Sequence, residues 1–387
     1  MRLGIVGGKL QGTEAAYLAR KAGLETVLYD RKTEPTALHL CDSFYMVDLL
    51  QEDNLDHVFN NVDLVLPALE DDQVLERLVH WSGQSGRPLA FDPASYAVTS
   101  SKILSNRLFD AIGVPQPLPW PDCRFPVIAK GSKGSGSDNV HRVDSSDELD
   151  RLLSSSSIEW VVQEWVDGPS YSLEVIGNGT GGYTYQVTAL EMDAGFDCKR
   201  VYAPAGLDPE AVMQFEEVTL AICSSLKLKG IMDVEVILTG DGVKVLEIDA
   251  RLPSQTPTVV LLSSGVNLLE ELVEAYLKPG KPAAGQWRGV ENGAIYEHLR
   301  VSPGLIEVCG EHIMSGAGPL SLLTGFYGAD EALTSYKPGR GSWVATMIYT
   351  GSSLDEARLK REEVIREIIK GQSGGQFIDP YPANIGQ

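Results

Sequence analysis

The chain has 387 residues, of which 43% are hydrophobic and 22% are charged, and its formal net charge is −21. This length and composition predict a soluble protein of two or three globular domains with a sizeable core. The negative charge argues against binding to nucleic acid phosphates, and the lack of any run of about 18 apolar residues argues against a membrane span.

Strand and helix signals alternate over the first ninety or so residues. Strands are predicted at 3–6, 25–29, 62–67 and 89–91, and a helix at 13–22 is closed by Gly23. A polar region before the third strand is expected to be helical. Alternation of this kind predicts a parallel, Rossmann-like sheet, which we place at residues 1–95.

A small α+β unit follows. A helix over 102–112 stops at Gly113, and the proline-rich connector 114–121 marks a boundary. Strands at 126–130, 160–166 and 171–176 surround a helix from Ser146 to about 153, which Ser145 or Ser146 caps. We expect residues 115–178 to form a mobile lid, and residues 96–114 and 179–387 to form the largest domain.

The remainder predicts further strands, a helix over 209–226 and, in the tail, a strand over 344–349 and a charged helix over 354–370. Residues 371–387 are rich in glycine and proline, which predicts a frayed end. The five cysteines are scattered and include no Cys-x-x-Cys pair, so we expect reduced thiols in a cytoplasmic protein and no zinc site.

Two apolar runs, 231–238 and 245–251, are joined by a Thr-Gly-Asp-Gly turn and predict a β-hairpin. Side chains alternate along a strand, so the polar residues of each run share one face. These residues are Asp233 and Glu235 in the first run, and Glu247, Asp249 and Arg251 in the second.

Four converging carboxylates would repel one another unless cations offset them. Mg²⁺ held between carboxylates and nucleotide phosphates meets this need. The alternative is a salt-bridged, solvent-exposed face. The polar loop 253–258 directly after Arg251 favours a site, because sites are commonly built on loops at strand ends.

Glycines also mark two candidate phosphate contacts. The turn Gly7–Gly12 follows a strand and opens a helix, with Asp30 at the end of the next strand. An NAD-dependent oxidoreductase would need G-x-G-x-x-G, which this turn lacks, so a tight turn without a ligand and a site for another small ligand stay open. Lys130 precedes the Gly/Ser loop 131–137, which is not a Walker loop and suits either a cap over a triphosphate or a simple linker.

The order of these pieces resembles the ATP-grasp superfamily: a helix lysine, a strand lysine with a Gly/Ser loop, Gln-Glu-Trp-Val-x-Gly at 163–168, and a hairpin ending in Glu-x-Asp-x-Arg. The resemblance implies ATP and Mg²⁺ as cofactors. Its nucleotide contacts would be Lys102, Lys130, Ser135, Gly136, Ser137, Gln163, Glu164, Trp165 and Val166. Its metal ligands would be Glu247, which bridges two ions, Asp249, and either Asp233 or Glu235.

The chain departs from the superfamily pattern at two places. Asp249 stands where the superfamily usually has Asn, which adds one negative charge. Pro169 and Ser170 stand where many relatives place an acid that grips the ribose, and this leaves Asp167 or Glu174 as substitutes.

Longer strings at 7–18, 172–177, 229–235, 247–258 and 295–299 resemble the ligase family of pyrrolysine biosynthesis, and the likeness fades beyond residue 300. The resemblance implies an ATP-dependent ligase. It would phosphorylate the carboxylate of (3R)-3-methyl-D-ornithine and join it to the ε-amine of L-lysine. Such chemistry needs neutralised phosphoryl charge and a closed site that keeps water from the acyl phosphate.

The same resemblance implies substrate contacts. Arg251 would steady the acyl phosphate and, with Lys130, act in catalysis, while Glu174, Ser254 and Thr256 would hold the D-ornithine unit. The lysine pocket would contain Leu10, Gln11 and Glu70, although Glu70 could equally be a solvated loop acid. A second group would touch a nucleotide or shape the N-terminal domain: Lys9, Asp30, Asp48 and Leu49.

The main rival is another ATP-grasp carboxylate–amine ligase of the D-alanine–D-alanine type, followed by a biotin-dependent carboxylase. An NAD-dependent oxidoreductase would leave the acidic hairpin unexplained. A non-catalytic nucleotide-binding regulator would have little use for this set of lysines, acids and arginine. The implied partners are small molecules alone, with a homodimer left open because the superfamily is often dimeric.

Overall fold

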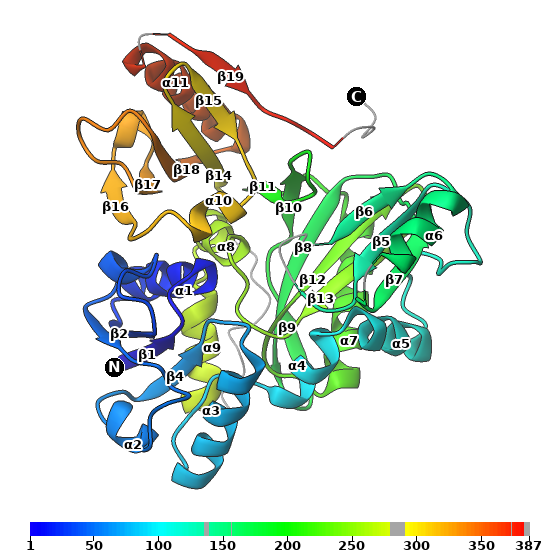
Figure 1. The fold of residues 1–387 in the computed structure, drawn as a ribbon, viewed down its shortest axis with the longest axis horizontal. Coiled ribbons are helices and arrows are strands. Elements are labelled where there is room, and N and C mark those ends of the chain that lie inside the picture. The colour runs from blue at the N-terminus through cyan, green and yellow to red at the C-terminus, as the bar shows by residue number, and fades with distance from the viewer. Residues whose placement is uncertain (135–138, 156, 279–290, 373, 383–387) are drawn as a thin grey trace.

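A computed structural model describes residues 1–134, 139–155, 157–278, 291–372 and 374–382. Within these ranges the strands form sheets of four, twelve and three strands. Figure 1 shows the four-stranded sheet at one side, the three-stranded sheet at the other, and the large sheet between and above them. The chain is therefore of the mixed α/β class that the sequence predicts.

The N-terminal sheet is parallel, as predicted, in the order β3-β2-β1-β4. Its strands are β1 (Arg2–Val6), β2 (Glu25–Asp30), β3 (Ser43–Met46) and β4 (Leu64–Pro67). Its helices are α1 (Leu10–Lys21), η1 (Leu38–Leu40), α2 (Leu55–Val58), α3 (Asp72–Ser85) and α4 (Pro93–Thr99).

Two expectations for this sheet are wrong. The region expected to be only helical contains edge strand β3, a short run of Ser-Phe-Tyr-Met whose side chains are partly or fully exposed. Residues 89–91 form no strand, since Leu89 makes only an isolated bridge to Val65. Pro88 precedes this bridge, and proline has no N–H to donate to a ladder.

Helix α1 joins the N-terminal sheet to the large sheet. It starts directly at the glycine turn, where a Cβ on Gly12 would lie 2.0 Å from the Gly7 carbonyl oxygen, so this close crossing requires glycine. Asn267 Nδ2 donates to Leu18 O at 2.9 Å, and Tyr17 Oη donates to Glu331 at 2.6 Å. Helix α1 is thereby held against the helices and strands of the large sheet.

The three-stranded sheet has its own small core. Its order is β6-β5-β7, with β5 (Val127–Gly131), β6 (Val140–Val143) and β7 (Trp160–Glu164). Helices α5 (Lys102–Ile112) and α6 (Ser146–Ser154) flank it in sequence, and Ser145 caps α6 by accepting from Glu148 N. A separate cluster of buried apolar side chains packs between this sheet and α6.

The large sheet carries the acidic hairpin near one edge, in the order β13-β12-β8-β10-β11-β14-β18-β17-β16. Its strands are β8 (Ser170–Asn178), β9 (Gly182–Thr184), β10 (Thr188–Met192), β11 (Cys198–Ala203), β12 (Lys229–Thr239), β13 (Gly242–Asp249), β14 (Gly293–Ser302), β15 (Leu305–Val308), β16 (Ser321–Thr324), β17 (Glu331–Thr334), β18 (Trp343–Gly351) and β19 (Gln376–Ile378). Its helices are α7 (Pro209–Leu226), α8 (Thr256–Ser264), α9 (Leu268–Leu277), α10 (His312–Ser315), η2 (Phe326–Gly328) and α11 (Leu354–Gly371).

The expectation of a frayed tail is wrong for its described part. Strand β19 pairs in parallel with β15, from Leu305 opposite Gln376 to Glu307 opposite Ile378. Asp379, which follows β19, makes several ion pairs, and these anchor the chain where its glycine and proline content predicted fraying. The domain boundaries proposed from the sequence stay a prediction.

All five cysteines are unpaired, as the sequence predicts. Across the residues that the structure describes, no helix combines the length and the apolar character that crossing a bilayer requires.

Candidate functional site

A cavity of about 990 Å³ lies where the N-terminal sheet faces the large sheet. One wall comes from the start of α1 and the ends of β2 and β4, and the other comes from the acidic hairpin, the loop after it and α10. The predicted site residues that line it are Lys9, Leu10, Gln11, Asp30, Asp48, Leu49, Glu70, Asp233, Glu235, Glu247, Asp249, Arg251, Ser254 and Thr256.

The acidic hairpin places carboxylates opposite one another. In the ladder of β12 and β13, Asp233 pairs with Asp249 and Glu235 with Glu247. On the other side of β12, Asp233 pairs with the fully buried Glu174 of β8. Like charges directly opposite destabilise a sheet, so this arrangement indicates a function that needs the negative charge.

These acids are poised to bind cations. Burial, followed by the charge of Glu247, raises the pKa of Glu235 to about 7, while Lys130 and Lys102 oppose the shift. Burial also raises the pKa of Asp249 to about 6, against the effect of Arg251. The pKa of Asp233 rises well above its usual value through burial and then Asp249. Among the described residues, Asp249 Oδ1 is buried without a hydrogen-bond partner, so an all-oxygen donor set suitable for Mg²⁺ is present.

The two predicted phosphate lysines lie beside this donor set. Lys102 Nζ is 2.8 Å from Glu247 Oε1 and 3.0 Å from Gly134 O. Lys130 on β5 is close enough to Glu247 and Lys102 for both to affect its pKa, which burial lowers overall. Ser135, Gly136 and Ser137, the predicted phosphate cap, lie outside the described residues.

The predicted adenine segment 163–166 ends β7 beside the connector. Glu164 N donates to Leu118 O at 2.8 Å, and the Glu164 carboxylate accepts from Leu118 N and Lys244. The Trp165 ring makes an edge contact with Phe196, with 5.6 Å between ring centroids. These contacts tie the segment to the connector and to the turn between β10 and β11.

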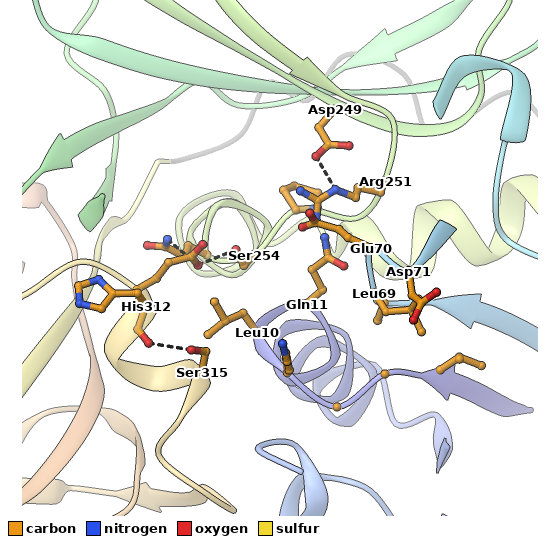
Figure 2. Close-up of a pocket in the computed structure, with 18 of the residues that line it drawn as sticks. Leu10, Gln11, Leu69, Glu70, Asp71, Asp249, Arg251, Ser254, His312 and Ser315 are labelled. Carbon is orange, nitrogen blue, oxygen red and sulfur yellow. Dashed lines mark hydrogen bonds and ion pairs between the residues drawn. The ribbon is translucent and has the colours of Figure 1, made fainter. Parts of the chain in front are cut away.

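Arg251 links the two walls of the cavity. Its Nη1 lies 2.7 Å from Glu70 Oε1 of the N-terminal domain, and its Nε contacts Asp249 Oδ2. Figure 2 shows Gln11 and Leu10 rising from the start of α1 beneath these side chains. The predicted catalytic arginine and the predicted lysine-pocket acid are thus direct neighbours.

The glycine turn is closed by Asp30. Its Oδ2 accepts from Gly8 N at 2.7 Å, and its Oδ1 accepts from Lys32 N at 2.8 Å. Asp48 similarly accepts from Leu50 N at 3.0 Å. Both acids therefore shape the turns around them, while still facing the cavity.

The loop after Arg251 is fixed from two sides. Gln255 has a φ of 75°. Burial raises the pKa of the neighbouring Glu14 to about 7, while hydrogen bonds from Thr258 and Gln255 oppose this shift. Glu14 Oε1 accepts from Thr258 N at 2.7 Å at the start of α8. Thr256 Oγ1 is buried at the start of α8, and its side chain acts on the Glu174 carboxylate, lowering the pKa of Glu174 against the larger effect of burial.

Sequence reasoning missed Glu311. Its Oε2 accepts from Ser254 Oγ at 2.7 Å and from Gln255 Nε2 at 2.9 Å, and its burial raises its pKa. Glu311 lines the cavity, and its neighbours His312 and Ser315 lie at the end of the cavity away from Arg251 (Figure 2). It follows a short strand and belongs to no recognised motif, so the sequence carries no local signal for it.

The chain matches known proteins along most of its length. The family model of the ATP-grasp domain matches residues 99–255. The 3-methyl-D-ornithine–L-lysine ligase of Methanosarcina acetivorans is 33% identical over 359 residues, which cover 92% of this chain and 94% of that protein. The protein of the same name from Methanosarcina barkeri is 34% identical over 368 residues, with coverages of 92% and 94%.

Solved structures share the fold at much lower identity. An N5-carboxyaminoimidazole ribonucleotide synthetase in complex with ADP has a TM-score of 0.70 and 16% identity, covering 96% of this chain and 97% of that one. The biotin carboxylase domain dimer of Hydrogenobacter thermophilus 2-oxoglutarate carboxylase has a TM-score of 0.73 and 12% identity, with coverages of 94% and 89%. These similarities show the ATP-grasp architecture.

Proposed function

The chain belongs to the 3-methyl-D-ornithine–L-lysine ligase family of ATP-grasp enzymes, and we propose that it catalyses this ligation in pyrrolysine biosynthesis. In the proposed reaction, a carboxylate oxygen of (3R)-3-methyl-D-ornithine attacks the γ-phosphorus of ATP and releases ADP. The ε-amine of L-lysine then attacks the acyl carbon, phosphate leaves, and the amine loses a proton as the amide forms.

One observation carries the proposal. The acidic hairpin, whose Glu247 pairs with Lys102, lines a cavity together with the N-terminal turn, and Arg251 stands at the junction. Phosphoryl transfer needs positive charge around the transferring group, and a condensation needs two substrates to meet in one space. The cavity offers both features together.

We assign Glu235, Glu247 and Asp249 to Mg²⁺. The charges of Lys130 and Lys102 act on Glu235, which supports a role for this acid on the phosphate side of the hairpin. Asp249, Glu235, Glu174 and Arg251 act on Asp233, which supports a role for Asp233 on the other side. Bound Mg²⁺ would neutralise phosphate charge and act as a Lewis acid. The sequence leaves the choice between Asp233 and Glu235 open, and we propose Glu235.

The donor amino acid is proposed to bind between β8, β12 and the loop after Arg251. Asp233 and its ladder neighbour Glu174 would accept hydrogen bonds from its ammonium groups. Ser254 and Thr256 would contact the amino acid backbone from the start of α8. Arg251 would hold the acyl phosphate, since a planar guanidinium matches phosphate oxygens well.

The acceptor lysine is proposed to bind against the N-terminal wall. Glu70 and Glu311 supply negative charge for its ammonium groups, and Leu10 and Gln11 face its methylene chain. Gln11 Nε2 is buried with no partner in the described part of the chain, and an acceptor carboxylate would satisfy it. ATP would take Lys102, Lys130 and segment 163–166, whereas Lys9, Asp30, Asp48 and Leu49 are proposed to shape this wall.

The test is an ADP-release assay with Mg-ATP, D-ornithine or its 3-methyl derivative, and L-lysine, with each amino acid omitted in turn and product mass recorded. ADP release that requires both amino acids, with a mass equal to their sum minus water, supports the proposal. ADP release with a different amine, or without a condensed mass, would favour another carboxylate–amine ligase of the same fold. A homodimer stays a prediction, to be checked by light scattering.

A further inference from the structure

The hairpin of β10 and β11 forms a wall of the cavity that the proposed chemistry does not use directly. Met192, Phe196, Asp197 and Cys198 line the cavity from this hairpin. Its turn also carries Phe196 against Trp165 of the proposed adenine segment. The position of this turn therefore affects both ends of the site.

The turn is latched to α10 through two carboxylates. Asp193 Oδ2 accepts from Gly310 N at 2.9 Å, and Asp197 Oδ2 accepts from His312 N at 3.0 Å and contacts His312 Nδ1 at 2.5 Å. A Cβ on Gly310 would lie 2.1 Å from Asp197 Oδ2, so the segment fits closely on the turn. Glu311 lies between these latched residues, and its carboxylate holds Ser254 and Gln255.

Asp193, Asp197 and His312 have the composition of a metal site, and their ligand atoms lie within 4.8 Å of one another. The oxygens are already engaged, however: Asp193 Oδ1 accepts from Gly195 N and Asp197 N, in addition to the bonds to Gly310 and His312. Two carboxylates thus accept hydrogen bonds from four backbone N–H groups, which indicates that they hold the turn in place. We call these contacts of Asp193 and Asp197 with Gly310 and His312 the latch.

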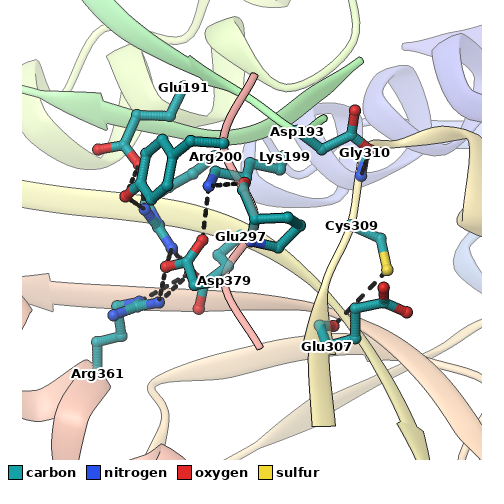
Figure 3. Close-up of polar contacts among 12 residues, drawn as sticks. Glu191, Asp193, Lys199, Arg200, Glu297, Glu307, Cys309, Gly310, Arg361 and Asp379 are labelled. Atoms are coloured by element: carbon teal, nitrogen blue, oxygen red, sulfur yellow. Dashed lines mark hydrogen bonds and ion pairs between the residues drawn. The ribbon is translucent and has the colours of Figure 1, made fainter. Parts of the chain in front are cut away.

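The C-terminal tail holds the same hairpin at the strand residues that flank its turn, to one side of the contacts with Gly310 (Figure 3). Asp379 Oδ1 accepts from Lys199 Nζ at 2.6 Å, and Asp379 Oδ2 accepts from Arg200 Nη2 at 2.6 Å and from Arg361 Nη2 at 3.1 Å. The Lys199 ammonium also lies 3.2 Å from the centroid of the Tyr381 ring, and Tyr381 Oη donates to Glu191 Oε2 at 3.1 Å. The tail thus contacts both strands of the hairpin.

The Asp379 carboxylate of the tail balances buried positive charge. Lys199 is fully buried, Arg200 is 6% exposed, and Glu297 between Arg200 and Arg361 is fully buried. The cations Lys199, Arg200 and Arg361 pair with the carboxylates of Glu191, Glu297 and Asp379. Loss of the Asp379 charge therefore leaves three positive groups with two carboxylates. Leaving a buried charge without its partner is strongly destabilising. Either the tail or strands β10 and β11 would then shift and let water reach the unpaired positive charge.

We infer that Asp379 is a positioning residue: through Lys199 and Arg200 the tail fixes the β10–β11 hairpin, and through the latch on Gly310–His312 it places Glu311 for the acceptor amine. The identity of the acceptor in this inference rests on the proposed function. The link from Asp379 through the hairpin to Glu311 rests on the contacts alone. It assigns the C-terminal tail a part in acceptor recognition.

The test uses the full-length variant Asp379→Asn, with Tyr381→Phe as a milder change. Asp330→Asn is the matched control, because Asp330 pairs with Lys360 in the same half of the large sheet without contacting the hairpin. Hydrogen exchange should rise in 189–203 and 309–316 for Asp379→Asn, rise less for Tyr381→Phe, and stay unchanged there for Asp330→Asn. The KM for L-lysine should rise roughly three- to thirtyfold, with the KM for ATP within about twofold of the parent.

The two readouts separate the possible failures. Faster exchange confined to 374–382, or an unchanged KM for L-lysine in an active enzyme, would overturn the inference. An equal rise in the KM for both substrates would also overturn it, since that would indicate general loosening. The parent protein could fail to ligate amino acids while hydrogen exchange in Asp379→Asn still rises in 309–316. In that case the proposed function fails, but the link from the tail through the β10–β11 hairpin to Glu311 stands.

Discussion

Lys102 Nζ and Glu247 Oε1 lie 2.8 Å apart, joining a helix before the three-stranded sheet to the last strand of the acidic hairpin. The lysine offsets one of the four facing carboxylates of the hairpin. Phosphate oxygens would compete for this lysine and a divalent cation for this carboxylate. Binding of Mg-ATP would therefore break this ion pair, with the lysine then contacting phosphate and the carboxylate contacting the cation.

Replacement of Glu247 by Gln should abolish ligation while the protein stays folded. Loss of a central metal-binding charge removes electrostatic stabilisation of phosphoryl transfer, and we expect the kcat to fall by about a hundredfold or more. Asp241→Asn, an exposed change in the turn of the same hairpin, is the control and should leave the kcat unchanged. Full ADP release by Glu247→Gln would contradict the metal assignment.

The variants Glu235→Gln and Asp233→Asn should differ in the substrate they affect. Glu235→Gln should raise the Mg²⁺ concentration needed for half-maximal activity, because Glu235 is a proposed metal ligand on which the charges of Lys130 and Lys102 act. Asp233→Asn should raise the KM for the D-ornithine donor by about ten- to a hundredfold, the range expected for losing a buried charged hydrogen bond. Titrations of each ligand at saturating levels of the others decide the point, and a reversed pattern would exchange the two roles.

Glu70→Gln should weaken acceptor binding more than donor binding. The change removes one charge from the proposed lysine pocket and one partner from Arg251. We expect the KM for L-lysine to rise by about tenfold or more and the KM for ATP to change little. Glu76→Gln, at an exposed position of α3, provides the control. A specific effect on ATP instead would place the lysine pocket elsewhere.

Glu14 should make stability fall with rising pH. Burial raises its pKa from 4.5 to about 7, so the folded state holds a proton that the unfolded state has released between these values. The stability present below pH 4.5 is lost as the pH rises through 7, by about 3 kcal/mol at most for a shift of this size. Urea unfolding at pH 5 and pH 8 measures the loss. Glu14→Gln should reduce the difference between the two pH values, and an unchanged difference would assign it to other groups.

Elements with strong local signals were predictable from the sequence. Helices α5 and α7 have the predicted limits, because Ser101 and Asp208 cap their first turns and Gly113 ends α5. The hairpin was equally clear, and alternation along its strands identified the residues that face the cavity. The edge strand β3 and strand β19 were missed because partner strands stabilise them through backbone hydrogen bonds, which side-chain patterns do not reveal.

The site was predictable where a motif surrounds it and not elsewhere. Arg251 could be named from its place after the hairpin, but its pairing with Glu70 joins segments of two sheets. Glu311 and Asp197 reach the cavity only because α10 packs on the β10–β11 turn. A single acid after a short strand resembles many surface acids, so the fold was needed to distinguish it.

The burial of α1 constrains how the ligated product can leave. Glu14, Tyr17 and Leu18 fasten the N-terminal sheet to α8, α9 and the neighbourhood of β17, so swinging that wall aside would break buried contacts. The three-stranded sheet has a separate small core and is joined to the large sheet mainly through polar and edge contacts such as Glu164 with Lys244 and Trp165 with Phe196, so we predict that it moves more readily than the N-terminal wall. We therefore predict that the exit opens on the side of the three-stranded sheet, in which case the speed of that opening would set an upper limit on turnover, independent of how fast the amide bond forms.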